Sequence, residues 1–211
     1  MGAWKNSCKE RDLTVKEYVL TTPLRDEDVR QMRIGDVVYL TGHIFTSRDM
    51  AHLKYKELLA LGQPLPKDFR GAAVFHAGPV CLKQADGTWK LQLIGPTTSI
   101  RMEPYADMVG KMGVKAVLGK GGMGDDTQRA CREYGYVYLQ AAPGCAAKLS
   151  QGVKCVADVH YLEMGMPEAL WDLEVERFGP LVVGMDTFGS SIYHDLREQA
   201  YAVLDKTYKE G

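Results

Sequence analysis

The sequence contains no apolar run that approaches the roughly 20 residues needed to cross a bilayer. Its start, residues 1–8, carries early charge and no apolar segment, so we expect no secretory signal peptide. Net charge is also lacking: 26 basic and 27 acidic residues give −1 at pH 7. No long-range field therefore attracts nucleic acid or an anionic membrane, and any anion must be recognised by a local cluster of charges.

Cysteine is sparse, and no two cysteines have the CxxC spacing of many metal sites. The five residues are Cys8, Cys81, Cys131, Cys145 and Cys155. An odd, scattered set favours reduced thiols in a cytoplasmic protein over a disulfide framework. We therefore expect no metal site that is housed wholly in this chain.

Length and composition indicate one folded unit. The 211 residues are 45% apolar and 25% charged, which is typical of a globular protein with a single core. Strand-like and helix-like segments intermix without a repeat or a long linker, so the prediction is one α/β domain over residues 19–211, after a polar N-terminal arm at residues 1–18. The predicted strands are residues 37–45, 72–76, 89–94, 114–118, 136–139, 153–161 and 181–185, and the predicted helices are 23–36, 46–62 and 125–134.

The second predicted helix begins with a capping pattern, in which Thr46 precedes Asp49 by three residues. Four apolar residues supply a stripe that we expect to be buried, and Gly62 ends the helix. The stripe consists of Met50, Leu53, Leu58 and Leu61.

Arg48 and His52 lie four residues apart and so share a face of this helix. Arg48 either receives a carboxylate together with the free N–H groups of the first turn or pairs with a surface acid such as Asp49. His52 is either a proton-transfer group near neutral pH or a partly buried histidine with a hydrogen bond.

A hydroxyl-rich turn follows the apolar run at residues 89–94. Gly95 and Pro96 end the strand, and Thr97, Thr98 and Ser99 come next, with Arg101 close behind. Hydroxyls can donate, accept or pass protons, and a guanidinium can grip a carboxylate with two hydrogen bonds. The turn is therefore suited to a small anion.

A second Gly-Pro break, at Gly78 and Pro79, ends the strand before it, directly after His76. Either two neighbouring strands end beside one cleft, or both breaks are ordinary tight turns.

The glycine-rich segment at residues 119–124 matches GxGxxG and contains Lys120. A dinucleotide site also needs an acidic residue about 20 positions later, and residues 139–144 contain none. The dinucleotide interpretation therefore fails, which leaves a backbone nest with a lysine for a small anion, or a plain strand-to-helix turn. Cys145 is interpreted as a structural thiol because no partner can be assigned to it.

Six motifs stand in the order found in one known family. They are Leu40-Thr41-Gly42, Ser47-Arg48-Asp49-Met50-Ala51-His52, Phe75-His76-Ala77-Gly78-Pro79, Gly95-Pro96-Thr97-Thr98-Ser99-Ile100-Arg101-Met102, Gly119-Lys120-Gly121-Gly122-Met123-Gly124 and the segment 162–171. With these motifs the chain resembles the β subunit of two-subunit iron–sulfur hydro-lyases, class I fumarase and L(+)-tartrate dehydratase. The resemblance runs from about residue 18 to beyond residue 186. It implies a single swivelling β/β/α domain with mixed sheets flanked by helices.

The resemblance also implies a partner and a reaction. The partner is an α subunit whose three cysteines ligate a 4Fe–4S cluster, with the heterodimer pairing again into an (αβ)2 assembly. The implied reaction is the reversible hydration of fumarate to malate; the alternative is dehydration of L(+)-tartrate to oxaloacetate. An alternative of another class is a binding or assembly module without catalytic residues of its own.

Matched position by position, the resemblance assigns roles to six residues. Arg48, Arg101 and Lys120 would bind the substrate carboxylates. Thr97 would take the C3 proton, with Thr98 beside it at the substrate. His52 matches a histidine considered catalytic in the family. The acid that protonates the leaving hydroxide would come from the α subunit, as would the metal.

Overall fold

The computed structural model describes residues 15–209, and side chains up to residue 205. Most of the predicted N-terminal arm, residues 1–14, lies outside the described part. The first described strand, β1 (Glu17–Thr21), begins at the end of that arm.

A seven-stranded sheet forms the centre of the described chain, in the order β1-β2-β3-β6-β7-β9-β8. The first five of these strands are parallel to their neighbours, and β9 runs antiparallel to β2, β7 and β8. The bounds of the six strands after β1 are Val37–Thr46 for β2, Ala73–Phe75 for β3, Ala116–Gly119 for β6, Val137–Gln140 for β7, Val153–His160 for β8 and Leu170–Met185 for β9. The predicted α/β class is therefore confirmed.

The long strand β9 closes the sheet on itself. It pairs with β7 at its end and with β2 along most of its length, so the pairings β2-β3-β6-β7-β9-β2 form a closed circuit. Two features bend β9 enough to do this: Arg177 has a φ of 45°, and Gly179 has a φ of 155°. The main core, with Phe75, Trp171 and Phe178, is packed on these strands.

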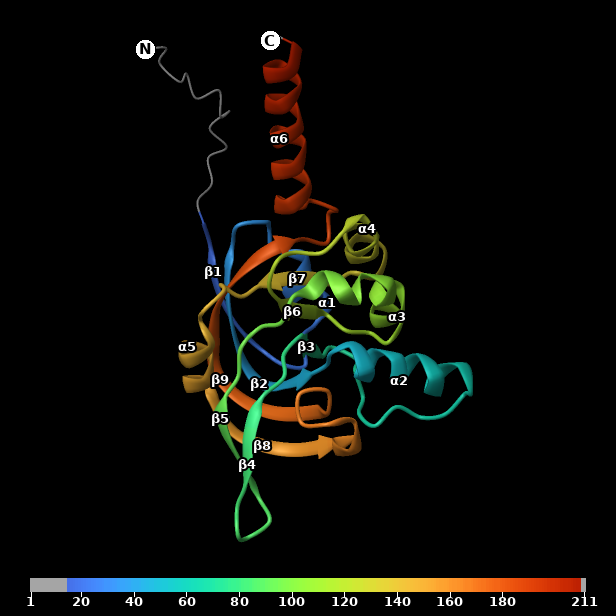
Figure 1. Cartoon of the computed structure of the whole chain (residues 1–211), viewed down its shortest axis with the longest axis vertical. Coiled ribbons are helices and arrows are strands. Elements are labelled where there is room, and N and C mark those ends of the chain that lie inside the picture. The colour runs from blue at the N-terminus through green and yellow to red at the C-terminus, as the bar shows by residue number, and fades with distance from the viewer. Residues whose placement is uncertain (1–14, 210–211) are drawn as a thin grey trace.

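Helices and short elements surround this sheet. The helices are α1 (Asp26–Arg30), α2 (Asp49–Ala60), α3 (Ala106–Lys111), α4 (Asp125–Tyr134), α5 (Ala146–Gln151) and α6 (Ile192–Lys209), with 3-10 helices η1 (Ser99–Tyr105) and η2 (Leu162–Met164). A hairpin of β4 (Val80–Lys83) and β5 (Trp89–Leu93) projects from one end of the molecule and α6 from the other (Figure 1). A second core, with Tyr55, Phe69 and Tyr136, includes residues of α2, α3 and α4. None of the helices in residues 15–209 has the length and apolar character of a membrane span.

Several predicted elements are confirmed and several are wrong. Strand β2 and helix α4 lie where they are predicted, and α4 ends at Gly135 in the left-handed conformation. The helix predicted at residues 23–36 is only the short α1, and the strand predicted at 181–185 is the end of β9, which begins at Leu170. Helices α3, α5 and α6 and strands β1 and β4 are not predicted at all.

The start of α2 also differs from its prediction. Thr46 does not cap the helix, because its hydroxyl donates to the Ala169 carbonyl at 3.2 Å and accepts from the Trp171 N–H at 3.0 Å. The predicted apolar stripe is wrong as well. Its members Met50, Leu53 and Leu61 are exposed, and α2 instead buries Ala51, His52 and Tyr55.

Candidate active site

Three parallel strands end side by side and bring distant parts of the sequence together. Strands β2, β3 and β6 are successive neighbours, so their carboxyl ends lie at one edge of the sheet. Arg48 follows β2, His76 follows β3 and Lys120 follows β6. Crevices at the carboxyl ends of parallel strands are the usual ligand sites of open α/β sheets.

The hydroxyl-rich turn lies between the ends of β3 and β6. The Thr97 N–H donates to the His76 carbonyl at 2.7 Å, and the Thr97 carbonyl accepts from the Lys120 N–H at 3.2 Å. The Ser99 N–H donates to the Lys120 carbonyl at 3.0 Å. The turn is thus held on both sides like a short extra strand, and the Thr97 side chain is only partly buried. Thr98 is exposed.

Arg101 connects this turn to the start of α2. Its Nε and Nη2 donate to the two carboxylate oxygens of Asp49 at 3.1 and 2.9 Å, and Nη2 also donates to Thr97 Oγ1 at 3.3 Å. Partial burial opposes ionisation of Asp49, but the hydrogen bonds from Arg101 hold the pKa of Asp49 below its ordinary value. The positive guanidinium beside Thr97 Oγ1 favours negative charge on that oxygen.

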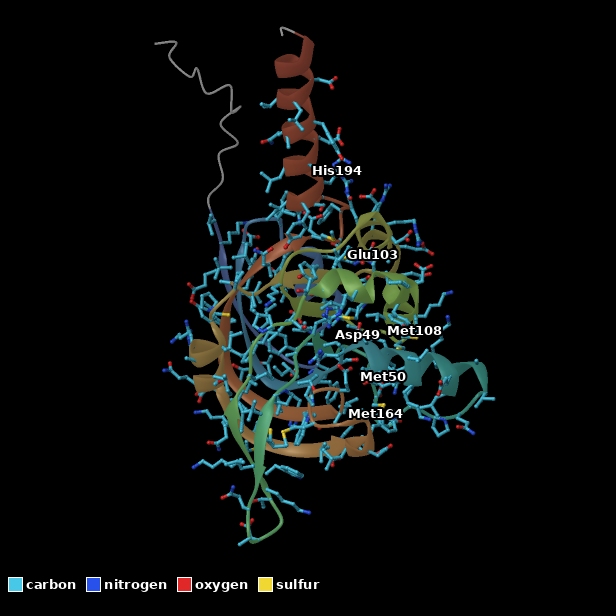
Figure 2. All side chains as sticks on the ribbon, in the orientation of Figure 1. Asp49, Met50, Glu103, Met108, Met164 and His194 are labelled. Atoms are coloured by element: carbon cyan, nitrogen blue, oxygen red, sulfur yellow. The ribbon has the colours of Figure 1, made fainter. Side chains whose placement is uncertain are left out.

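Arg48 faces a carboxylate of its own. Its Nε lies 3.2 Å from Glu168 Oε1 without hydrogen-bond geometry, and no described residue hydrogen-bonds this buried nitrogen. The other oxygen of Glu168 accepts the Met50 N–H at the start of α2 at 3.1 Å. Gly78 leaves room for this arrangement, since a Cβ there would lie 2.8 Å from Arg48 Nη1. Figure 2 shows Asp49 and Met50 together at this end of α2.

His52 lies beneath these charged groups and is 1% exposed. Its Nδ1–H donates to the Arg48 carbonyl at 2.8 Å and lies 3.0 Å from Ser47 Oγ, and its ring stacks on Tyr105 at 5.3 Å. Burial lowers the pKa of His52 from 6.5 to about 4. The ring is therefore neutral at physiological pH and supports the backbone of Arg48, and its catalytic role stays a prediction.

Lys120 is partly buried, and none of the residues described here forms an ion pair with it. Its ammonium is close enough to Cys145 to oppose the rise in the pKa of that thiol, which burial causes. The role of Lys120 in binding a carboxylate stays a prediction.

A carboxylate of the chain itself occupies the end of the glycine-rich segment where α4 begins. Glu103 fills the start of α4, accepting the Gly124 and Thr127 N–H groups at 2.8 and 2.9 Å and the Thr127 hydroxyl at 2.6 Å. An internal carboxylate thus takes the place that the sequence left open for an external anion.

The described residues contain no group of three or more His, Cys, Asp or Glu side chains arranged to hold a metal ion. Four of the five cysteines lie in this range and are free thiols; burial raises the pKa of Cys81 to about 11. A thiol with a raised pKa is a poor metal ligand, because the thiolate is the form that binds metal.

Comparison with known proteins places this geometry in a family. The family model described as the fumarase C-terminus matches residues 2–196. The chain belongs to the fumarase C-terminal family. This confirms the resemblance drawn from the motifs, which include all of Arg48, Thr97, Arg101 and Lys120.

Curated relatives from this family share more than two fifths of the aligned residues. The β subunit of L(+)-tartrate dehydratase from Escherichia coli is 43% identical over 82% of this chain and 85% of its own length. A Methanocaldococcus jannaschii protein provisionally named as the same subunit is 44% identical over 87% of this chain and 94% of its own. A Geobacillus stearothermophilus protein provisionally named a class I fumarate hydratase is 42% identical over 90% of this chain and 36% of its own.

The structure brings all six predicted site residues to one edge of the sheet, and it adds two that are not predicted as site residues. Asp49 and Glu168 each face a predicted arginine, and both lie inside the motifs that carry the resemblance. No sequence signal pointed to an acidic residue here, because a carboxylate side chain repels the carboxylate ligand that the site is predicted to bind.

Proposed function

We propose that this chain is the β subunit of a cytoplasmic hydro-lyase that interconverts fumarate and malate, working with an α subunit that carries a 4Fe–4S cluster. The observation that carries the proposal is the contact between Arg101 and Thr97 at a sheet edge with two further cations, Arg48 and Lys120. The relative that is provisionally named a class I fumarate hydratase supports it.

In this proposal the chain's own residues bind the substrate and move one proton. Arg48, Arg101 and Lys120 hold the two carboxylates of malate. Deprotonated Thr97, stabilised by the Arg101 guanidinium, takes the proton from C3, while the hydroxide at C2 leaves toward an acid on the partner. A cluster held by the partner subunit would supply a Lewis acid that assists departure of the hydroxide.

The carboxylates of Asp49 and Glu168 determine which guanidinium nitrogens remain for a substrate. Arg101 uses Nε and Nη2 on Asp49 and Thr97, and a guanidinium has five N–H donors, so Nη1 stays available for a substrate oxygen. Arg48 Nε is buried against Glu168, so contact with a substrate oxygen falls to the terminal nitrogens of Arg48. Asp49 and Glu168 thus orient the two guanidinium groups before the substrate arrives.

A partner beside this site is supported by the exposed apolar residues next to it. Met50 follows Asp49 and is 46% exposed, and Ile100 precedes Arg101 and is 47% exposed. Exposed large apolar side chains beside a charged site are typical of a surface covered by another subunit. The names of the E. coli and M. jannaschii relatives, both β subunits, support the same arrangement.

A second candidate function is the dehydration of L(+)-tartrate to oxaloacetate. It is favoured by these two relatives, which this chain covers nearly end to end, whereas it spans about a third of the class I hydratase. Malate and tartrate present the same pair of carboxylates, so Arg48, Arg101 and Lys120 serve both.

The test is an anaerobic assay of the complex purified after co-expression with its α subunit. Malate, fumarate and L-tartrate are each offered at equal concentration, and kcat/KM is measured for each. A preference for malate and fumarate supports the leading proposal, a preference for tartrate supports the second candidate, and no turnover of any of them contradicts both.

A further inference from the structure

A buried chain of polar side chains lies directly behind the proposed base. Ser99 is fully buried, two residues after Thr97, and its hydroxyl has two polar neighbours. The Tyr138 hydroxyl donates to Ser99 Oγ at 3.1 Å, and His76 Nδ1 lies 3.0 Å from the same oxygen. These residues come from β7, η1 and the end of β3, so the chain crosses three neighbouring parts of the site.

The side chains of Tyr138, Ser99 and His76 form a continuous set of hydrogen bonds. Each hydroxyl has a single proton, and Tyr138 gives its own to Ser99. On its other side Ser99 Oγ forms a hydrogen bond with His76 Nδ1, and the second ring nitrogen of His76 is Nε2. That nitrogen is buried and has no hydrogen bond within the described residues. The His76 ring meets the His52 ring edge to face at 5.4 Å, which extends the contact to the helix that carries Arg48.

The buried set of Tyr138, Ser99 and His76 is also connected to the backbone that holds Thr97. The His76 carbonyl accepts the Thr97 N–H, and the Ser99 N–H donates to the carbonyl of Lys120. Space around Ser99 is closed, since a Cβ at Gly119 would lie 1.8 Å from Ser99 Oγ. A hydroxyl enclosed in this way cannot move without moving the turn.

From this arrangement we infer that Tyr138, Ser99 and His76 are positioning residues, which hold the Thr97 hydroxyl in line with the substrate's C3 proton through the backbone of the turn. The inference rests on the proposed function for its catalytic consequence. None of the three touches the substrate, because all three side chains are at most 1% exposed. Burial keeps His76 neutral by lowering its pKa, so the chain holds one pattern of hydrogen bonds at physiological pH.

Tyr136 provides a matched control for Tyr138. It lies two residues earlier, is 1% exposed, and its buried hydroxyl donates to the Ala106 carbonyl at 3.3 Å and also hydrogen-bonds Cys131. Replacing either tyrosine with phenylalanine removes one buried hydroxyl and leaves the ring in place. Only Tyr138→Phe breaks the chain to Ser99.

The experiment compares Tyr138→Phe with Tyr136→Phe in two measurements. In the αβ complex, Tyr138→Phe is expected to lower kcat about 10–100-fold while KM stays near the wild-type value, because misplaced catalytic groups cost that much without weakening carboxylate binding. Tyr136→Phe keeps the wild-type kcat. In the full chain alone, amide hydrogen exchange at residues 97–101 is expected to be faster in Tyr138→Phe than in Tyr136→Phe.

Ser99→Ala carries the same expectation as Tyr138→Phe and replaces it if that variant does not fold. Equal behaviour of the two tyrosine variants, whether both change or neither does, would overturn the inference. If the wild-type complex turned over neither diacid, the proposed function would fail, and the exchange measurement would still decide whether this chain of side chains holds the turn.

Discussion

At the scale of single residues, Arg101 makes two contacts in the site. It pairs with Asp49 and also donates to Thr97 Oγ1. A lysine carries the same charge but lacks the planar fork that makes these contacts together. The Thr97 hydroxyl therefore depends on the geometry of the guanidinium as well as on its charge.

Arg101→Lys is accordingly expected to lower kcat/KM of the αβ complex about 10–100-fold, the loss that follows from charge-assisted hydrogen bonds worth roughly 1.5–3 kcal/mol. Arg70→Lys is the matched control, since Arg70 makes the same two-pronged pair with Asp68 on an exposed surface away from the site. Steady-state kinetics on both variants checks this, and an equal loss in the two would count against a role for Arg101 in the site.

His52 makes the stability of the fold depend on pH. Burial lowers its pKa from 6.5 to about 4, so the unfolded chain takes up the proton before the folded chain does. Its contribution to stability is complete above pH 6.5 and is lost as the pH falls from 6.5 toward 4. Between pH 7 and pH 5 the loss is about 2 kcal/mol.

Urea unfolding of wild type and His52→Gln at pH 7 and pH 5 measures this contribution. The variant is expected to lose less stability than wild type over that interval, with a remaining loss from His76, whose pKa burial also lowers. If His52→Gln lost as much stability between pH 7 and pH 5 as wild type does, protonation of the His52 ring would not be the cause of the loss.

Among the elements, α4 is held by a residue outside it. Glu103 in η1 accepts two N–H groups and one hydroxyl from the first turn of α4. Glu103→Gln places an amide NH₂ against some of these donors, so we expect it to lower the free energy of unfolding by about 2 kcal/mol. Glu133→Gln, which removes only an exposed pair with Arg129, should cost about 0.5 kcal/mol or less. Equal losses in chemical denaturation would refute this account of the α4 terminus.

Local sequence signals predict an element well when the element is stabilised by its own residues. Helix α4 is predicted with its observed bounds, because acidic residues start it and a left-handed glycine ends it. Strand β9 is predicted only at its end, since Gly179 and Pro180 interrupt the pattern and the pairing with β2 that continues the strand is not visible locally.

The candidate site, too, is predicted only in part by local sequence signals. The motifs identify Arg48, Thr97, Arg101 and Lys120, but the pair between Arg101 and Asp49 joins residues 52 positions apart. Likewise, Glu103 faces Thr127 from 24 positions away and fills a place that looked open in the sequence. Such contacts depend on the order of strands in the sheet, which local patterns do not contain.

At the scale of the whole molecule, the proposed active site is shared between two chains. The purified chain alone is expected to turn over neither malate nor tartrate, because the proposal assigns the metal and the acid for the leaving hydroxide to the α subunit. Adding the separately purified α subunit under anaerobic conditions should restore turnover, with activity that saturates as the two chains reach equal concentration. Turnover by this chain alone would contradict a shared site.

The central claim is that this chain supplies the base, and the kcat of Thr97 variants in the assembled αβ complex tests it most directly. Thr97→Ser keeps the hydroxyl and is expected to retain most of the activity. Thr97→Ala should lose about 10²–10⁴-fold in kcat, the usual worth of a general base, while the complex still assembles. A Thr97→Ala complex with the wild-type kcat would contradict the account.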